Sequence, residues 1–110
     1  MKNLEKEAFG AKPIKRLKHL LTLGNLWLYI LSIIKAQKKI HAYALDEHIE
    51  KEFFFKPSKV MVYIVLYKLE SEGLIKSEYE ERRRYYAITA KGEQTLALAK
   101  QYFELLSKKL

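Results

Sequence analysis

The fold is decided by the stretch SKVMVYIVLYKLESEGLI, which spans residues 58–75. Its apolar residues recur at helical spacing, which predicts one buried face. The residues of that face are Val62, Val65, Leu66 and Leu69. The Ser58 hydroxyl can cap the amino end of this helix, and Gly73 suits its carboxyl end. We therefore predict a helix over 58–72 with one buried and one exposed face.

The apolar period changes from 3.6 to 2 directly after this helix. Alternating residues over 75–80 and 84–88, around a charged tip at 81–83, predict a two-stranded hairpin. Thr89 can cap a final helix over 90–110. That helix carries two apolar seams, of which one can pack on the domain and the other needs a second surface. The seams are Leu96, Ala99, Phe103, Leu106 and Leu110, and Leu98, Tyr102 and Leu105.

Three further helices are predicted upstream. Pro13 can open a short helix over 14–23 after a polar arm at 1–12, and Gly24-Asn25 is expected to close it and cap the next. The helix over 26–37 is apolar nearly all round, so it should be covered on more than one side. A third helix is expected over 42–52, and the three phenylalanines at 53–55 should pack into the core.

The composition limits the possible functions of the protein more strongly than it limits the fold. The 110 residues suit one domain, and the net charge of +8 favours a polyanionic partner, nucleic acid first. Residues 1–40 hold nine basic and two acidic residues, so most of the excess lies at the amino end. The longest apolar stretch, 20–34, is too short for a membrane span of about 20 residues. With no signal peptide pattern either, we expect a cytoplasmic protein without membrane association.

The sequence offers no candidate for catalysis or metal binding. There is no cysteine, which excludes disulfides and thiolate sites. His41 and His48 fall on similar helical faces but lack a third ligand nearby. No glycine-rich phosphate loop or activated nucleophile occurs, and the carboxylates mostly neighbour lysine or arginine. We expect neither an enzyme nor a cofactor or metal.

The order of helix, helix, helix, hairpin and long helix predicts a winged helix-turn-helix followed by a dimerisation helix. The domain limits are 1–23 for a basic arm and short helix, 24–90 for the winged helix and 91–110 for the dimerisation helix. A major groove of B-DNA admits one α-helix, and a hairpin tip can reach a neighbouring phosphate or minor groove. The predicted DNA-contacting residues are Lys56, Ser58, Lys59, Val60, Tyr63, Tyr67, Arg82, Arg83 and Arg84.

Three segments of the sequence resemble the PadR family of transcription regulators. They are His41–Tyr43 at the start of a helix, Tyr63–Ile75 with its Tyr, Leu and Gly-Leu spacing, and Arg83–Gly92. The similarity covers roughly residues 25–110. The chain departs from the family pattern at Ala42, where glycine is usual, and at Val60 and Ile64. Residues 1–23 have no counterpart that we can place.

This resemblance implies a DNA-binding homodimeric repressor whose last helix exchanges contacts with its partner, often released by a small aromatic effector. It further implies that Tyr63 contacts the DNA backbone, that Ser58 and Lys59 lie at the groove, and that Arg83 serves the wing.

Several alternatives stay open at this level. The basic amino end would also suit an architectural protein that coats DNA, and winged helices also serve as protein-interaction modules. Residues 12–18 could form a solvated face, a DNA arm or a membrane anchor. The arginines at 82–84 could make only cross-strand ion pairs, and Trp27 could be a core residue rather than an effector platform.

Overall fold

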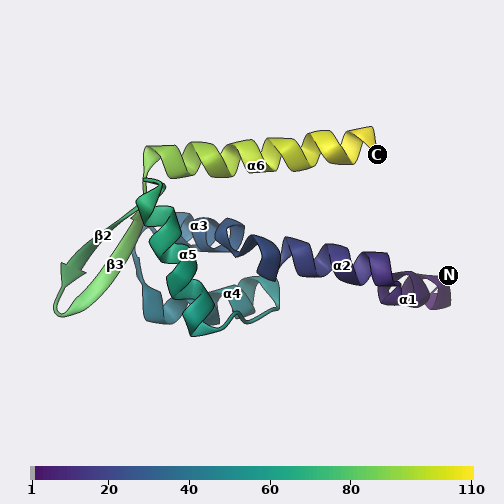
Figure 1. The fold of residues 1–110 in the computed structure, drawn as a ribbon, viewed down its shortest axis with the longest axis horizontal. Coiled ribbons are helices and arrows are strands. Elements are labelled where there is room, and N and C mark those ends of the chain that lie inside the picture. Colours follow the sequence, from purple (N-terminus) through teal and green to yellow (C-terminus); the bar gives the residue numbers. More distant parts are fainter. Residues whose placement is uncertain (1) are drawn as a thin grey trace.

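The computed structural model describes the backbone of residues 2–110 and the side chains of residues 6–110. It measures 54 × 27 × 20 Å. A body of helices and a small sheet carries two helical arms that project to the same side (Figure 1). The elements in chain order are α1 (Lys2–Gly10), α2 (Lys12–Leu21), η1 (Leu23–Asn25), α3 (Leu26–Gln37), β1 (Ile40–His41), η2 (Ala42–Ala44), α4 (Leu45–Phe53), α5 (Lys59–Ser71), β2 (Ile75–Glu80), β3 (Arg83–Ile88) and α6 (Ala90–Lys109).

Helix α3 lies at the centre of the body and contacts α4, α5, α6 and β3. Its sequence is apolar nearly all round, which is the pattern of a helix covered on several sides. Five of its residues are buried, Leu26, Ile30, Leu31, Ile33 and Ile34. The prediction that this helix is covered on more than one side is confirmed.

A helical stretch that includes α3 has the length and the apolar composition of a membrane-spanning helix. Among the described residues, Lys12–Gln37 is such a stretch by length and composition alone. A 3-10 turn at Leu23–Asn25 divides the stretch, and its second half supplies the buried residues of α3. The apolar residues of α3 therefore belong to the core, whereas no residue of α2 is buried.

The amino-terminal segment differs from the prediction. Residues 2–10 form the helix α1 rather than a polar arm, and Met1 lies outside the described residues. The short segment has no apolar periodicity to signal a helix, although Leu, Ala, Glu and Lys are good helix formers. Helix α2 begins at Lys12, with Pro13 in its first turn, and ends at Leu21 instead of residue 23.

Asn25 occupies the N-cap position of α3, but its side chain makes no capping bond. Its amide instead donates to the Leu20 carbonyl, and its carbonyl oxygen accepts from the Trp27 indole at 3.3 Å. The predicted cap at Gly24-Asn25 is therefore wrong in two respects: the C-cap of α2 is Thr22 rather than Gly24, and Asn25 makes no side-chain capping bond. Asn25 ties α2 to α3 across the 3-10 turn.

A third strand was not predicted. Ile40–His41 form β1, which pairs antiparallel with β3, so the sheet has the order β1-β3-β2. The helix expected from residue 42 begins only at Leu45, after the 3-10 turn η2. Two residues are too few to show a period of 2, so the strand depends on its partner rather than on its own pattern.

The three phenylalanines behave differently from one another. Phe53 and Phe55 pack edge-on against the Tyr29 ring, with centroids 4.8 and 4.9 Å away. Phe54 ends α4 in the left-handed conformation (φ 65°) and is 90% exposed, so its predicted place in the core is wrong. The single left-handed residue turns its side chain outward while both neighbours turn inward.

The helix-to-hairpin region follows the prediction closely. Ser58 caps α5 through a bond from the Met61 N–H, and Gly73 follows its end with φ 75°. Strands β2 and β3 pair from Ile75↔Ile88 to Glu80↔Arg83, and both turn residues, Glu81 and Arg82, have positive φ. Two such residues match a type I′ hairpin, whose twist suits the flanking strands.

Gly92 fixes how α6 leaves the sheet. A Cβ at this position would lie 2.1 Å from the Leu74 carbonyl oxygen, so the helix approaches the backbone more closely than any other residue allows. We predict that Gly92→Ala lowers the free energy of unfolding by about 1–3 kcal/mol, because backbone must shift to relieve the overlap. Urea denaturation measures the loss. Gly10→Ala is the matched control, since nothing lies within 4 Å of its Cβ, and an equal loss in both variants would contradict this account.

Candidate nucleic-acid interface

Helix α5 has one face in the core and one face open to solvent. Val62, Leu66 and Leu69 are buried, and Val65 is partly buried. On the opposite side Val60, Tyr63 and Tyr67 are 69%, 50% and 75% exposed. The prediction of a two-faced helix is confirmed, and nothing in the described chain covers its outer face.

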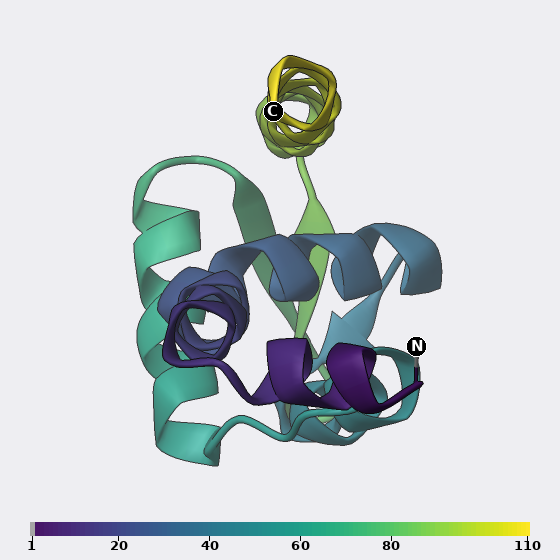
Figure 2. The same ribbon diagram turned by 90° about the vertical axis from the view of Figure 1, so that its right-hand side faces the viewer.

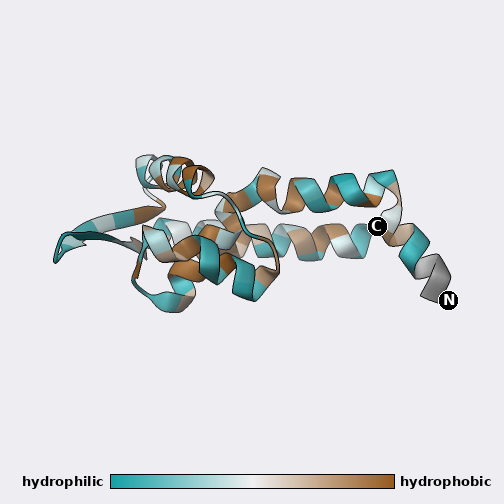
Figure 3. Cartoon of the chain, turned by 90° about the horizontal axis from the view of Figure 1, so that it is seen from below, coloured by the Kyte–Doolittle hydropathy of each residue, from teal (hydrophilic) through white to brown (hydrophobic). Residues whose placement is uncertain are grey.

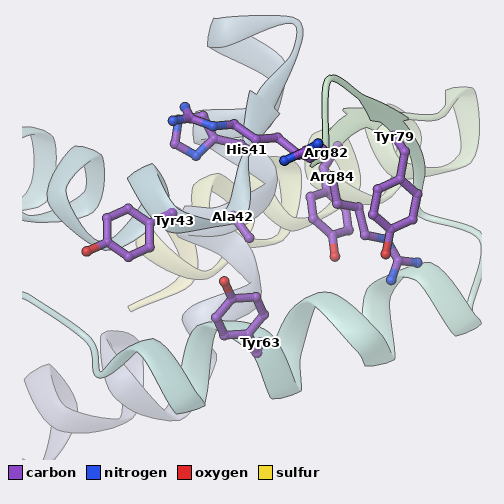
Figure 4. Close-up of a pocket in the computed structure, with 9 residues that line it drawn as sticks. His41, Ala42, Tyr43, Tyr63, Tyr79, Arg82 and Arg84 are labelled. Carbon is purple, nitrogen blue, oxygen red and sulfur yellow. The ribbon is translucent and has the colours of Figure 1, made fainter.

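A cleft of about 600 Å³ separates the first half of α5 from the hairpin. In Figure 4, Tyr63 reaches into it from α5, while Tyr79, Arg82 and Arg84 reach in from the hairpin. Tyrosine hydroxyls and guanidinium groups all donate hydrogen bonds to phosphate oxygens. The lining residues are His41, Ala42, Tyr43, Tyr63, Tyr79, Arg82, Arg83, Arg84 and Tyr86.

Tyr86 forms the inner wall of this cleft. It is only 5% exposed, and burial raises the pKa of its hydroxyl above the ordinary value of 10.0. The phenol therefore stays protonated at neutral pH and remains able to donate a hydrogen bond.

Lys59 is held by its own subunit at the amino end of α5. Its ammonium lies 3.1 Å from Asp46 Oδ2, donates to the Tyr43 carbonyl at 3.3 Å and stands 3.8 Å above the centre of the Tyr43 ring. Hydrogen bonding to the nearly buried Asp46 raises the pKa of Lys59. The lysine thus links α4 to α5, and we refer to Asp46, Tyr43 and Lys59 as the helix latch.

Arg84 is held in a comparable way at the other end of α5. Its Nη2 lies 2.7 Å from Glu70 Oε1, and its Nε donates to Ser77 Oγ at 2.9 Å. Ser77 in turn hydrogen-bonds Glu70, so α5 and both strands are joined. We refer to Glu70, Ser77 and Arg84 as the wing latch. Cross-strand ion pairing, one of the open alternatives for this arginine cluster, is replaced here by pairing to the helix.

The remaining predicted cations stand free of acidic partners. Within residues 6–110, no ion pair is formed by Lys56, Arg82 or Arg83, and all three are exposed. Lys56 precedes the amino end of α5, whose backbone N–H groups also favour phosphate. Arg82 and Arg83 lie at the turn of the hairpin. The tip of the hairpin is hydrophilic (Figure 3). These three side chains offer full positive charges to a polyanion.

Residues 30–98 match the family model described as the transcriptional regulator PadR-like family. The chain belongs to this family. Its members are transcription regulators, which is not a class of enzymes, and the winged helix and DNA-binding regulation expected from the sequence are confirmed.

Solved structures agree with this assignment. A PadR-like transcriptional regulator from Bacillus cereus is 30% identical, with a TM-score of 0.70 over 84% of this chain and 91% of that one. A PadR family regulator from Clostridium difficile is 27% identical, with a TM-score of 0.68 over 74% and 90%. F93 from STIV, described as a winged-helix DNA-binding protein, shares the fold at 17% identity, with a TM-score of 0.64 over 73% and 87%. Among curated proteins no relative matches the sequence.

Sequence reasoning missed part of the interface of this PadR-like chain. Tyr79 lies on the same strand face as Ile75 and Ser77, so the alternation of β2 carried a usable signal. His41 and Tyr43 reach the cleft through β1 and the turn after it, and the pairing of β1 with β3 has no sequence signature. Tyr86 lies on β3, where the alternation of the hairpin carried a usable signal. The roles of Asp46 and Glu70 were not predicted, because the sequence does not show which basic residue each of the many carboxylates will contact.

The helix latch gives a prediction about how α5 is positioned. Asp46→Asn keeps the side-chain shape but removes the charge that holds Lys59. We expect a lower melting temperature and weaker DNA binding, because α5 loses its link to α4. The slope of log affinity against log salt should stay unchanged, since no phosphate contact is lost.

The control for this variant is Glu52→Gln, an exposed acidic residue near the other end of α4. It changes the net charge by the same amount without touching the latch. If the two variants bind DNA equally well, the latch does not position α5.

Proposed function

We propose that this PadR-like regulator is a dimeric repressor that inserts one α5 from each subunit into successive major grooves of an operator. The supporting observation is the exposed outer face of α5 beside the arginine-bearing hairpin. Two-fold symmetry then requires a palindromic operator with half-sites about 34–36 Å apart. Repression follows if such a site overlaps a promoter, and we place the protein in the cytoplasm, where it meets chromosomal DNA.

The nine residues predicted to contact DNA divide into three roles in this proposal. Ser58 presents the amino end of α5, and Val60, Tyr63 and Tyr67 form its outer face. Lys59 and Arg84 act mainly through the latches, because their charges are already paired. Lys56, Arg82 and Arg83 contact phosphates, so they carry the electrostatic part of the affinity.

Footprinting on genomic DNA tests this function against the second candidate. The basic amino end of the chain favours an architectural protein that coats DNA, and such a protein would protect DNA uniformly. A regulator protects discrete palindromes. Absence of any DNA binding at ~50 mM salt by a folded dimer would instead indicate a protein-interaction module.

A small aromatic effector, which the resemblance implies, has a suitable place beside Trp27. A recess of about 370 Å³ lies behind α5, lined mainly by Leu23, Leu26, Trp27, Val65 and Leu69. A ligand there would contact the recognition helix from its inner side. Trp27 is the sole tryptophan, so its fluorescence should respond to a bound aromatic compound, and an unchanged spectrum at saturating concentrations would count against the site.

The phosphate contacts give a quantitative prediction. Lys56→Ala and Arg83→Ala should each weaken binding across most sequences and reduce the salt slope by about 1 per contact removed. Fluorescence anisotropy at several salt concentrations measures both effects. Lys108→Ala, at the far end of α6, is the matched control and should leave the slope unchanged.

The dimer gives a second prediction. Leu98, Tyr102 and Leu105 form a seam on α6 that is more than half exposed, which suits contact with another subunit. Leu105→Glu should raise the dimer dissociation constant by about 10–100-fold, because it buries a charge at an apolar contact. Analytical ultracentrifugation measures the constant. A wild-type chain that stays monomeric at high micromolar concentration would overturn the dimer.

A further inference from the structure

The two arms of the chain run side by side without closing on each other. Helices α1 and α2 form one arm and α6 forms the other, and both point away from the hairpin (Figure 1). Seen end-on, α6 and α2 stand apart (Figure 2), and α3 lies in the body near the base of both arms (Figure 1). The arms have similar lengths, since residues 2–21 and 90–109 each supply about 20 helical residues at about 1.5 Å per residue.

Helix α2 has a basic side and an apolar side. Lys12, Lys15, Arg16 and His19 follow the i, i+3, i+4, i+7 spacing of one face, and Ile14, Leu17 and Leu21 follow that of another. No residue of α2 is buried, and the apolar Leu17 and Leu20 are 51% and 47% exposed. Ile14 and Leu21 are partly buried, so the subunit's own fold covers the apolar face of α2 only in part.

The apolar faces of the two arms meet at a shared slot. This slot of about 340 Å³ is lined by Leu21 of α2, by Leu96, Lys100 and Phe103 of α6, and between them by Leu28, Tyr29, Ser32 and Phe53. Leu17 and Ile14 continue the Leu21 face outward along α2, and Leu106 and Leu110 continue the Phe103 face along α6. Two apolar stripes thus extend from one slot along two separate arms.

We infer that α2 and α6 together form a two-pronged receptor for α6 of a second copy of this chain. The inference rests on the proposed dimer and adds to it the segment 2–21, which lies outside the matched region 30–98. A partner helix placed between the prongs covers both stripes, and two-fold symmetry repeats the contact in the other subunit. The two α2 helices and two α6 helices then form a four-helix arrangement at the centre of the dimer.

The amount of exposed apolar surface suits this occupant. Ten large apolar side chains on the two arms and the adjoining turn are between 39% and 96% exposed. Such a set exceeds the scattered exposed apolar residues of a monomer and suits an interface, which in a stable complex buries about 800 Å² per partner. The ten side chains are Phe9, Leu17, Leu20, Leu23, Leu98, Tyr102, Phe103, Leu105, Leu106 and Leu110.

A second copy fits these faces better than a membrane does. A basic amphipathic helix can lie on an anionic bilayer, which contacts one side of a molecule. Here the stripes of α2 and α6 border the same slot from two sides, where a flat surface does not reach. A partner helix enters that space and leaves the basic side of α2 outward, toward solvent or DNA.

The test compares glutamates placed on the two faces of α2. Leu17→Glu introduces a charge into the proposed interface, and Lys15→Glu introduces the same residue on the basic face. Circular dichroism first checks that each variant keeps the secondary structure of the wild type. Analytical ultracentrifugation then gives the dimer dissociation constant of the full chain. We expect Leu17→Glu to raise the constant at least about 30-fold, as expected for a central interface residue, and Lys15→Glu to change it less than about threefold.

Cross-linking provides an independent readout that does not depend on stability. The chain has no cysteine, so introduced thiols are the only ones present. A copy carrying Leu17→Cys is mixed with a differently tagged copy carrying Leu106→Cys under oxidising conditions. We expect a disulfide between the two tags, and no such product when Lys15→Cys replaces Leu17→Cys.

The outcomes separate this inference from the dimer itself. If Leu105→Glu dissociates the chain but Leu17→Glu does not, α2 is not part of the interface and the inference is overturned while the dimer stands. Equal weakening by Lys15→Glu also overturns it, since charge alone would then explain the effect. Binding of anionic vesicles that Leu17→Glu abolishes, with an unchanged dimer, assigns the apolar face to a membrane instead.

Discussion

The structure depends on the packing of α5 against α3 through one apolar stripe. Val62, Leu66 and Leu69 bury their side chains against a helix that is itself covered on several sides. Apolar burial of this kind is the largest favourable term in folding a domain of this size. Because the stripe uses only one side of α5, its other side is exposed, and that exposed side is the one we propose to contact DNA.

Two ion pairs help to hold α5 in this arrangement. Two of the cations that the sequence suggested for DNA, Lys59 and Arg84, neutralise Asp46 and Glu70 and thereby hold α5 at both ends. Each pair is at least partly solvated on its basic side, so its energetic contribution is limited. The effect is on orientation. A helix that enters the groove of a rigid duplex needs a defined angle to the rest of its domain. The latches connect α5 to α4 and to the hairpin.

The sequence predicted those elements whose apolar period agrees with their capping and turn residues. For α5, the Ser58 cap, the apolar stripe and Gly73 all indicated the same limits, and for the hairpin the alternation and charged tip did so. Prediction failed where a segment was short or depended on a distant partner. The strand at Ile40–His41 exists because β3 pairs with it, Phe54 is exposed because one residue adopts a left-handed conformation, and α1 lacks any apolar period. Part of the cleft was missed for the same reason, since His41 and Tyr43 reach it through β1.

The central claim is that the outer face of α5 lies in the major groove. A photoreactive phenylalanine analogue placed at Tyr63 or Tyr67 tests it most directly, because it records contact at a named residue in the assembled complex. The account predicts cross-links to operator DNA from both positions, and none from the same analogue at Tyr102 on α6. Cross-links from Tyr102 with none from Tyr63 or Tyr67 would contradict it.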